Sequence, residues 1–288
     1  MSSPEPLSET LQNFRQTHPA RSVRAGGDDW EYLIGGSGRI TIVLIGGGGS
    51  TAESMFAVNV ALEHDFRVVS VTIPATAART GPVIDGILAV VDAIEIDRAV
   101  FLGHSLGGLV IQAFAARHFK RVSGLVLSNS AIYVGARKRL MPMAAAVMKH
   151  IPESLAIRMV MSQMDRLLRT ADAAEFWKSF YREESAKPGA AARLKTQLAL
   201  LGQFAVLLRE HPIPAAADWA ARAPVQIICS EDDRGFTRQE IAHLAQIYPR
   251  ASTATFPPGT GHLSFLTRPR EYVEIVRQFA AGLPEAET

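Results

Sequence analysis

The chain has 288 residues, and its 30 Lys and Arg side chains nearly balance its 28 Asp and Glu side chains, for a formal net charge of +2. A chain of this length can bury a substantial core in one large domain or two. The near balance of charge, without a long basic block, gives no electrostatic support for nucleic-acid binding. The single cysteine, Cys229, excludes an intramolecular disulfide.

The sequence gives no indication of a targeting or membrane-spanning segment. The first ten residues have neither the basic start nor the apolar core of a secretory signal peptide, so we expect a cytoplasmic protein. The longest apolar region, residues 99–116, is nearly long enough to span a bilayer, but it contains His104, Ser105 and Gln112. We interpret it as a buried strand followed by a helix, and expect no membrane span.

Strand-like apolar runs and helical periodicity alternate along most of the chain. An N-terminal hairpin is predicted at residues 21–25 and 30–34, with its turn at 26–29. Further strands are predicted at residues 40–45, 67–73, 99–102, 124–127, 225–229 and 252–256. Helices are predicted at residues 54–64, 83–94, 106–117, 239–247 and 270–280. This alternation is typical of an α/β fold with a mostly parallel sheet and helices on both faces.

The alternation stops between residues 131 and 217, where apolar residues recur at helical spacing and no strand is predicted. The sequence therefore predicts a core made of residues 1–130 and 218–288, interrupted by a helical insertion at 131–217. Six of the eight methionines lie in this insertion. Methionine suits adaptable apolar surfaces, so Met159 and Met161 are candidates either for the insertion's own core or for a pocket wall.

A serine flanked by glycines follows the apolar run that ends at residue 103, in the sequence Gly103-His104-Ser105-Leu106-Gly107. Gly-x-Ser-x-Gly between a strand and a helix is typical of a nucleophile elbow, in which a sharp turn exposes the serine hydroxyl. A Cβ at either glycine would crowd such a turn. Ser105 is therefore the candidate nucleophile, and His104 beside it is a candidate pocket residue.

A candidate acid and a candidate base follow further along the chain. The strand predicted at 225–229 leads into Ser230-Glu231-Asp232-Asp233, and carboxylates at the C-terminal end of a strand lie where open α/β sheets bind ligands. The strand predicted at 252–256 leads into a loop with two glycines and then His262. The order serine, acid, histidine differs from the orders in chymotrypsin-like and subtilisin-like enzymes.

These segments resemble the α/β-hydrolase superfamily, in which the catalytic residues follow this order. The segments that carry the resemblance are residues 40–50, 103–108, 229–233 and 261–263. The resemblance implies that the insertion at 131–217 is a cap that roofs the active site. Residues 14–19, Pro74 and residues 129–130 are similar to maspardin-like members, some of which are thought to act by binding partners.

The resemblance also implies a role for each candidate residue. Ser105 attacks the substrate, His262 accepts its proton, and Asp233 fixes the imidazole tautomer and stabilises the imidazolium. The family's usual Gly-Glu-x-Asp pattern selects Asp233 as the acid, with Asp232 as the alternative.

An oxyanion that forms at the attacked carbonyl needs two backbone N–H donors. We expect one from Leu106, at the N-terminus of a helix whose dipole also helps. The second is expected from the glycine run 46–49, where alignment with the family's His-Gly-x pattern selects Gly48, with Gly47 as second choice. A dinucleotide-binding fingerprint would require glycine at position 51 or 52, and neither is glycine.

Together these features predict a serine hydrolase that cleaves a carboxylic ester or thioester through an acyl-enzyme. Hydrolysis of a C–C bond in a β-diketone-like ring-cleavage product uses the same triad under a similar cap, and is the main enzymatic alternative. A non-catalytic binding protein with the same fold is the alternative from another class. We expect a small-molecule substrate with an apolar acyl or ring group and neither a metal nor an organic cofactor. The oligomeric state stays open.

Overall fold

The protein is described by a computed structural model for residues 6–148, 150–210 and 217–283. Its described strands form one eight-stranded sheet in the order β1-β2-β4-β3-β5-β6-β7-β8. The strands are β1 (Arg21–Ala25), β2 (Asp28–Gly35), β3 (Thr41–Ile45), β4 (Arg67–Val71), β5 (Ala99–His104), β6 (Val122–Ser128), β7 (Val225–Ser230) and β8 (Ser252–Phe256). β2 is antiparallel to both β1 and β4. The other six strands, β3 to β8, are parallel to one another.

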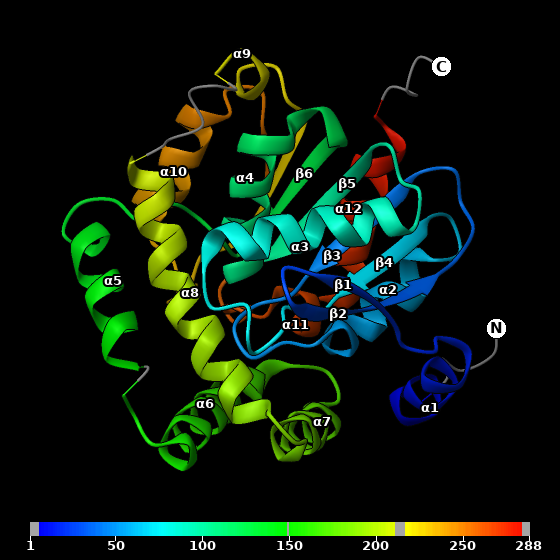
Figure 1. The fold of residues 1–288 in the computed structure, drawn as a ribbon, viewed down its shortest axis with the longest axis vertical. Coiled ribbons are helices and arrows are strands. Elements are labelled where there is room, and N and C mark those ends of the chain that lie inside the picture. The colour runs from blue at the N-terminus through cyan, green and yellow to red at the C-terminus, as the bar shows by residue number, and fades with distance from the viewer. Residues whose placement is uncertain (1–5, 149, 211–216, 284–288) are drawn as a thin grey trace.

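Helices cover both faces of this sheet (Figure 1). Alternate residues of a strand point to opposite faces, so Val43 and Ile45 of β3 pack with one group of helices and Ile42 and Leu44 with the other. The first group comprises α3 (Thr80–Ala93), α4 (Leu106–His118) and α10 (Arg238–Ile247). The second comprises α1 (Leu7–Thr17), α2 (Phe56–Leu62) and α12 (Pro269–Ala281). The predicted mostly parallel sheet with helices on both faces is confirmed.

A run of helices separates β6 from β7, and no strand lies there among the described residues. The helices are α5 (Arg137–Met148), α6 (Glu153–Leu167), α7 (Ala174–Ala186) and α8 (Ala190–Glu210), with a 3-10 turn at Leu168–Thr170 after α6. In Figure 1 α5, α6 and α7 lie beyond the edge of the sheet, and α8 runs back towards it. Two short helices, α9 (Ala217–Ala220) and α11 (Ser264–Thr267), lie in connections of the core.

The structure differs from the predicted elements in two places near the N-terminus. Helix α1 has no counterpart in the sequence prediction; it forms because Leu11 and Phe14, three residues apart, bury one face against the core. The hairpin turn is shorter than predicted, because Gly26 and Gly27 both take positive φ angles and close the turn alone. Asp28 and Asp29 therefore belong to β2 rather than to the turn.

The apolar region at residues 99–116 is divided between β5 and α4, as predicted. Across the three described ranges, no helix combines the length and the apolar character that crossing a bilayer requires.

A tight contact between α3 and β2 gives a test of this packing. Gly86 of α3 lies directly over the indole of the fully buried Trp30, at a distance that leaves no space for a Cβ. We expect Gly86→Ala to lower the free energy of unfolding by about 1–3 kcal/mol, because overpacking a filled core forces its neighbours to shift. Chemical denaturation measures the change.

Gly81 provides the matched control, because it lies in the first turn of the same helix and no atom outside its own stretch of helix lies within 4 Å of its Cβ position. Gly81→Ala should change stability by less than about 1 kcal/mol, since the helix preference of alanine is opposed by Pro82, which disfavours helical backbone at the residue before it. Equal effects of the two substitutions would contradict the packing described here.

Candidate active site

Ser105 lies at the sharp turn between the end of β5 and the start of α4. Its backbone has φ 53° and ψ −116°, a sparsely populated conformation for a residue with a side chain. The turn is possible because its flanking glycines meet backbone on both sides. A Cβ at Gly103 would overlap the backbone of Gly107, and a Cβ at Gly107 would overlap the carbonyl oxygen of Ile45.

The structure brings Ser105, His262 and Asp233 together at the carboxyl ends of β5, β8 and β7. His262 Nε2 lies 2.9 Å from Ser105 Oγ, and His262 Nδ1 lies 2.8 Å from Asp233 Oδ1. A carboxylate accepts only, so Nδ1 carries the proton and Nε2 is left to accept one from the serine. The side chains of His262 and Asp233 are 15% and 3% exposed. A hydroxyl, an imidazole and a buried carboxylate are thus joined by a chain of two hydrogen bonds.

Asp233 is held ionised by its neighbours. Burial alone would raise the pKa of its carboxyl, but the hydrogen bond and charge of His262 and the donors of Asn129 and Gly235 outweigh burial, and the pKa is lowered. Gly235 N donates to Oδ1 at 2.6 Å, and Asn129 Nδ2 donates to Oδ2 at 3.0 Å. Both carboxylate oxygens are therefore occupied and the rotamer is fixed.

Asn129, directly after β6, connects the acid to the loop that carries the histidine. It is fully buried with φ 42°, and its backbone N–H donates to the carbonyl of Ile228 in β7. Its side-chain oxygen accepts a 2.5 Å bond from Ser264, two residues after His262. In the sequence, residues 129–130 stand out only through a family similarity, and no pattern there indicates this role.

Asp232 does not contact His262 and instead fixes the backbone of the histidine loop. Its two carboxylate oxygens accept from the N–H groups of Gly259 and Gly261 at 2.8 and 2.9 Å. Gly259 and Gly261 both have positive φ, which these bonds help to hold. The adjacent aspartates thus have different partners, and the geometry places Asp233 rather than Asp232 against the imidazole.

The glycine run after β3 lies against the serine turn. The Cβ position of Gly47 is 3.3 Å from Ser105 Cβ, and Gly48 follows with Leu198 of α8 at 3.4 Å from its own Cβ position. Leu106 is the first residue of α4, so its N–H lies at the positive end of that helix. The run and the start of α4 therefore border Ser105 from two sides.

Gln197 of α8 fixes this glycine run, and no pattern in the sequence pointed to it. The side chain is 1% exposed; its oxygen accepts from Gly49 N at 2.5 Å, and its nitrogen donates to the carbonyls of Ser50 and Ile73 at 3.2 Å each. A buried amide with its partners satisfied holds them rigidly. The run is thus positioned by a residue far away in the sequence.

His104 lies beside the serine but takes no part in the hydrogen bonds that join Ser105, His262 and Asp233. It is buried, and burial together with the nearby charge of His262 lowers its pKa well below the usual value. Its Nδ1 lies 3.2 Å from Ser128 Oγ, and its ring packs 5.1 Å from the ring of His262 and 4.9 Å from that of Phe265. His104 is a neutral packing partner of the imidazole.

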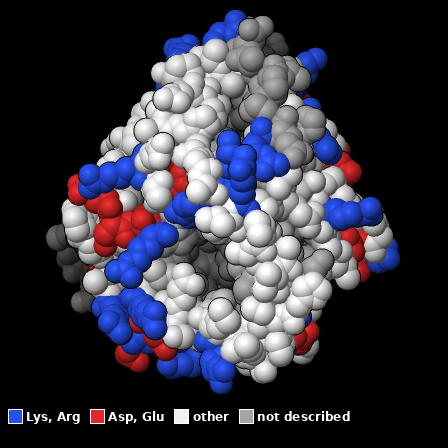
Figure 2. Space-filling model, turned by 90° about the vertical axis from the view of Figure 1, so that its left-hand side faces the viewer, with Lys and Arg blue, Asp and Glu red and all other residues white. Residues whose placement is uncertain are grey.

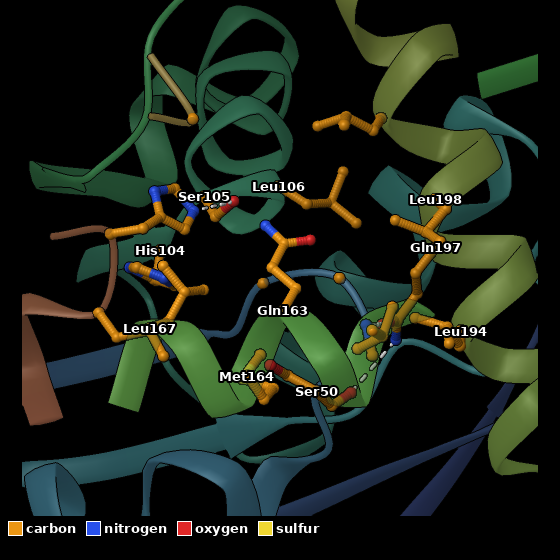
Figure 3. A pocket seen from close by; sticks show the side chains of 18 of the residues that line it. Ser50, His104, Ser105, Leu106, Gln163, Met164, Leu167, Leu194, Gln197 and Leu198 are labelled. Atoms are coloured by element: carbon orange, nitrogen blue, oxygen red, sulfur yellow. Dashed lines mark hydrogen bonds between the residues drawn. The ribbon is translucent and has the colours of Figure 1, made fainter. Parts of the chain in front are cut away.

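A cavity of about 480 Å³ opens over Ser105 between the core and helices α5 to α8. Figure 3 shows His104 and Leu167 on one wall and Leu194, Gln197 and Leu198 of α8 on the opposite wall. Apolar side chains from the helices provide most of the roof. They are Met141, Ile157, Val160, Met161, Met164, Leu167, Leu194, Leu198 and Leu201.

The two methionines proposed for this wall lie in different places. Met161 lines the cavity and accepts a bond from Ser185 Oγ at 3.3 Å. Met159 was a wrong choice: it is 48% exposed and does not line the cavity. Residues two positions apart on a helix are rotated by about 200°, so the side chains at positions 159 and 161 point in nearly opposite directions. Met141 and Met164 line the wall instead.

The charges around the cavity are mainly basic. Arg137, Arg193 and Arg234 line it, while Glu184 is its carboxylate outside the triad. On the face that includes α5 and α10, Lys and Arg side chains lie around a hollow (Figure 2). No cluster of three or more potential metal ligands occurs in residues 6–148, 150–210 and 217–283.

The lowered pKa of Asp233 predicts a pH dependence of stability. A carboxylate whose pKa is lower in the folded than in the unfolded protein stabilises the fold above the unfolded pKa of about 4 and loses this effect as pH falls through the folded pKa. We therefore compare the free energy of unfolding of the wild type with that of Asp233→Asn. The wild type should be the more stable of the two, and its advantage should be larger at about pH 5 than at about pH 2. Denaturation at each pH measures this, and a constant difference would contradict the assignment.

Comparisons with known proteins agree with the fold. A solved esterase, RhEst1 from Rhodococcus sp. ECU1013, superposes with a TM-score of 0.64 at 21% identity, over 92% of this chain and 99% of that one. A meta-cleavage product hydrolase from Pseudomonas fluorescens IP01 gives 0.66 at 21% identity, over 90% and 96%. Both likenesses concern the fold.

A curated relative from Mycobacterium phage D29, named "Putative non-heme haloperoxidase", is 37% identical over 78 residues. The match covers 24% of this chain and 28% of the relative's length. The family model described as "Alpha/beta hydrolase family" matches residues 42–275, well over half of the chain. The chain belongs to the alpha/beta hydrolase family.

Proposed function

We propose that the protein is a serine hydrolase that cleaves a carboxylic ester or thioester through an acyl-enzyme. The proposal rests on two hydrogen bonds that join three side chains. Ser105 Oγ lies 2.9 Å from His262 Nε2, and His262 Nδ1 lies 2.8 Å from Asp233 Oδ1. These distances are those at which a base can take the proton of a nucleophile and be oriented by a third group. Ser105 also lines a cavity with room for a small substrate.

The proposed reaction has two halves. Ser105 Oγ attacks the carbonyl carbon as His262 Nε2 takes its proton, and the imidazolium then protonates the leaving oxygen or sulfur. A water molecule next gives a proton to Nε2 and adds to the acyl carbon, which releases the acid and restores the serine. Asp233, already ionised, stabilises the imidazolium in both halves.

The oxyanion that forms in each half needs donors, and we propose the N–H groups of Leu106 and Gly48. Leu106 contributes the positive end of α4, where negative charge is favoured. Gly48 lies in the run that Gln197 holds through Gly49. Gly47, the second choice, is the residue whose Cβ position is nearest the serine side chain.

We further propose that residues 131–217 act as the cap of this site. The support is that α5, α6 and α8 supply the apolar roof of the cavity, whereas the core supplies the reacting groups. A cytoplasmic location remains part of the same proposal.

A second candidate reaction is hydrolysis of a C–C bond next to a carbonyl. It requires the same nucleophile, base and oxyanion donors, and the fold similarity to a meta-cleavage product hydrolase supports it. A substrate panel of esters, thioesters and β-diketones distinguishes the two reactions.

A serine-directed fluorophosphonate probe tests the nucleophile. We expect it to label the wild type at Ser105, and Ser105→Ala to abolish labelling and lower turnover about 10⁴- to 10⁶-fold, because the three groups act as a unit. His262→Ala should cost about as much, and the variant should still fold. Folded protein without labelling would indicate a binding protein instead, and more than a tenth of wild-type turnover in either variant would contradict the triad.

The cap gives a prediction with a built-in control on α6. Met161 lines the cavity and Met159 faces outward. Met161→Ala should change the preference for acyl length, because each buried methylene contributes about 0.8 kcal/mol. Met159→Ala should leave kcat/KM unchanged across the same esters. Parallel length profiles for Met161→Ala and the wild type, with a lowered melting temperature, would mean that Met161 serves packing alone.

A further inference from the structure

The cavity wall contains an arginine whose side chain forms no hydrogen bond or ion pair with the described residues. Arg193 is half-buried on α8, where it borders the cavity over Ser105 and also a second cavity lined by Glu31 and Glu53. Its Nε is buried without an acceptor among the described residues. No carboxylate in that part of the chain forms an ion pair with it. A buried donor atom without a partner is costly, and in a binding site a ligand can supply the missing acceptor.

The other charges of the wall are already engaged or exposed. Arg137 donates to the carbonyl of Gly235 at 2.6 Å and pairs with Glu240 at 3.4 Å. Glu184 accepts a 2.8 Å bond from Thr51 and pairs with Lys187, which neutralises the one carboxylate of the wall. Arg234 is exposed. Arg193 is therefore the half-buried cation of this wall that is available to a ligand.

The position of Arg193 along α8 relates it to the reacting carbonyl. Leu198 lies against Gly48 and Leu194 against Gly49, so this stretch of α8 runs along the glycine run. Arg193 precedes Leu198 by five residues, which is about 7.5 Å along the helix axis. A group bound at Arg193 would thus lie several bonds away from a carbonyl held at Gly48.

The direction of the substrate follows from the proposed reaction. His262 must reach the leaving atom to protonate it, so the leaving group lies on the side of His262. Figure 3 places Leu194 and Leu198 on the wall opposite His104, which packs against His262. The acyl group therefore extends towards α8. It would contact the apolar side chains of Leu198 and Leu194 before it reaches Arg193.

We propose that the site takes acyl groups that end in a carboxylate, and that Arg193 binds this carboxylate. The planar guanidinium matches the two oxygens of a carboxylate. A phosphate dianion would need a second free cation, and the wall offers none that is buried. This inference rests on the proposed esterase or thioesterase function: hydrolysis breaks the bond from the acyl carbon to oxygen or sulfur, water supplies the new hydroxyl, and the products are a dicarboxylate and an alcohol or thiol.

The test compares p-nitrophenyl half-esters of succinate, adipate and suberate with the same esters capped at the far carboxyl by a methyl group. The wild type should favour the free carboxylate at one of these lengths by about ten- to a hundredfold in kcat/KM, the range for a hydrogen bond to a charged group. Arg193→Met should reduce this ratio to about one, while Arg193→Lys should keep part of it. The matched control is Arg166→Met on α6, since Arg166 is exposed and outside the cavity wall.

Each outcome separates this inference from the proposed function. Probe labelling and turnover of capped esters without a preference for the free carboxylate would overturn the inference and leave the function intact. A preference that survives Arg193→Met would also overturn it, as would stronger binding of an ester that ends in phosphonate. Neither labelling nor turnover of any ester would mean that the proposed function itself is wrong.

Discussion

The geometry of the site depends on the strained turn at Ser105. A residue with a side chain at φ 53° and ψ −116° costs about 1–3 kcal/mol, and it persists only where its surroundings leave no alternative. Here β5 is buried on both sides by β3 and β6, and α4 is buried along most of its length. The contact of Gly107 with the carbonyl of Ile45 sets how closely α4 approaches β3. A larger residue there would move the hydroxyl away from the imidazole.

The same sheet edge explains why the site could be predicted in outline. Residues that follow parallel strands lie at one edge whatever their separation in the sequence, so Ser105, Asp233 and His262 could be brought together by strand prediction alone. The order of the motifs and the elbow glycines also fixed the family. Short sequence patterns predict this outline of the site because strand ends and tight turns strongly constrain the residues next to them.

Other parts of the site depend on contacts that no local pattern records. In the sequence, Gln197 is indistinguishable from any polar residue of an amphipathic helix. Its contact with Gly49 arises only because α8 packs against the core. The choice between Met159 and Met161 depends on the rotation of α6, which its tertiary partners set. Helix α1 was missed because its two buried residues make a short pattern that becomes informative only beside α2.

The bonds of Gln197 connect α8 to the glycine run beside Ser105, in addition to its place in the roof of the cavity. Displacement of α8 would break the bonds of Gln197 to Gly49 and Ser50 and so disturb the glycine run beside Ser105. No hydrogen bond between this run and α5 or α6 is found among the described residues. For protein engineering under the proposed function, we expect substitutions on α6 to change the choice of acyl group alone, and those that displace α8 to alter selectivity and turnover together.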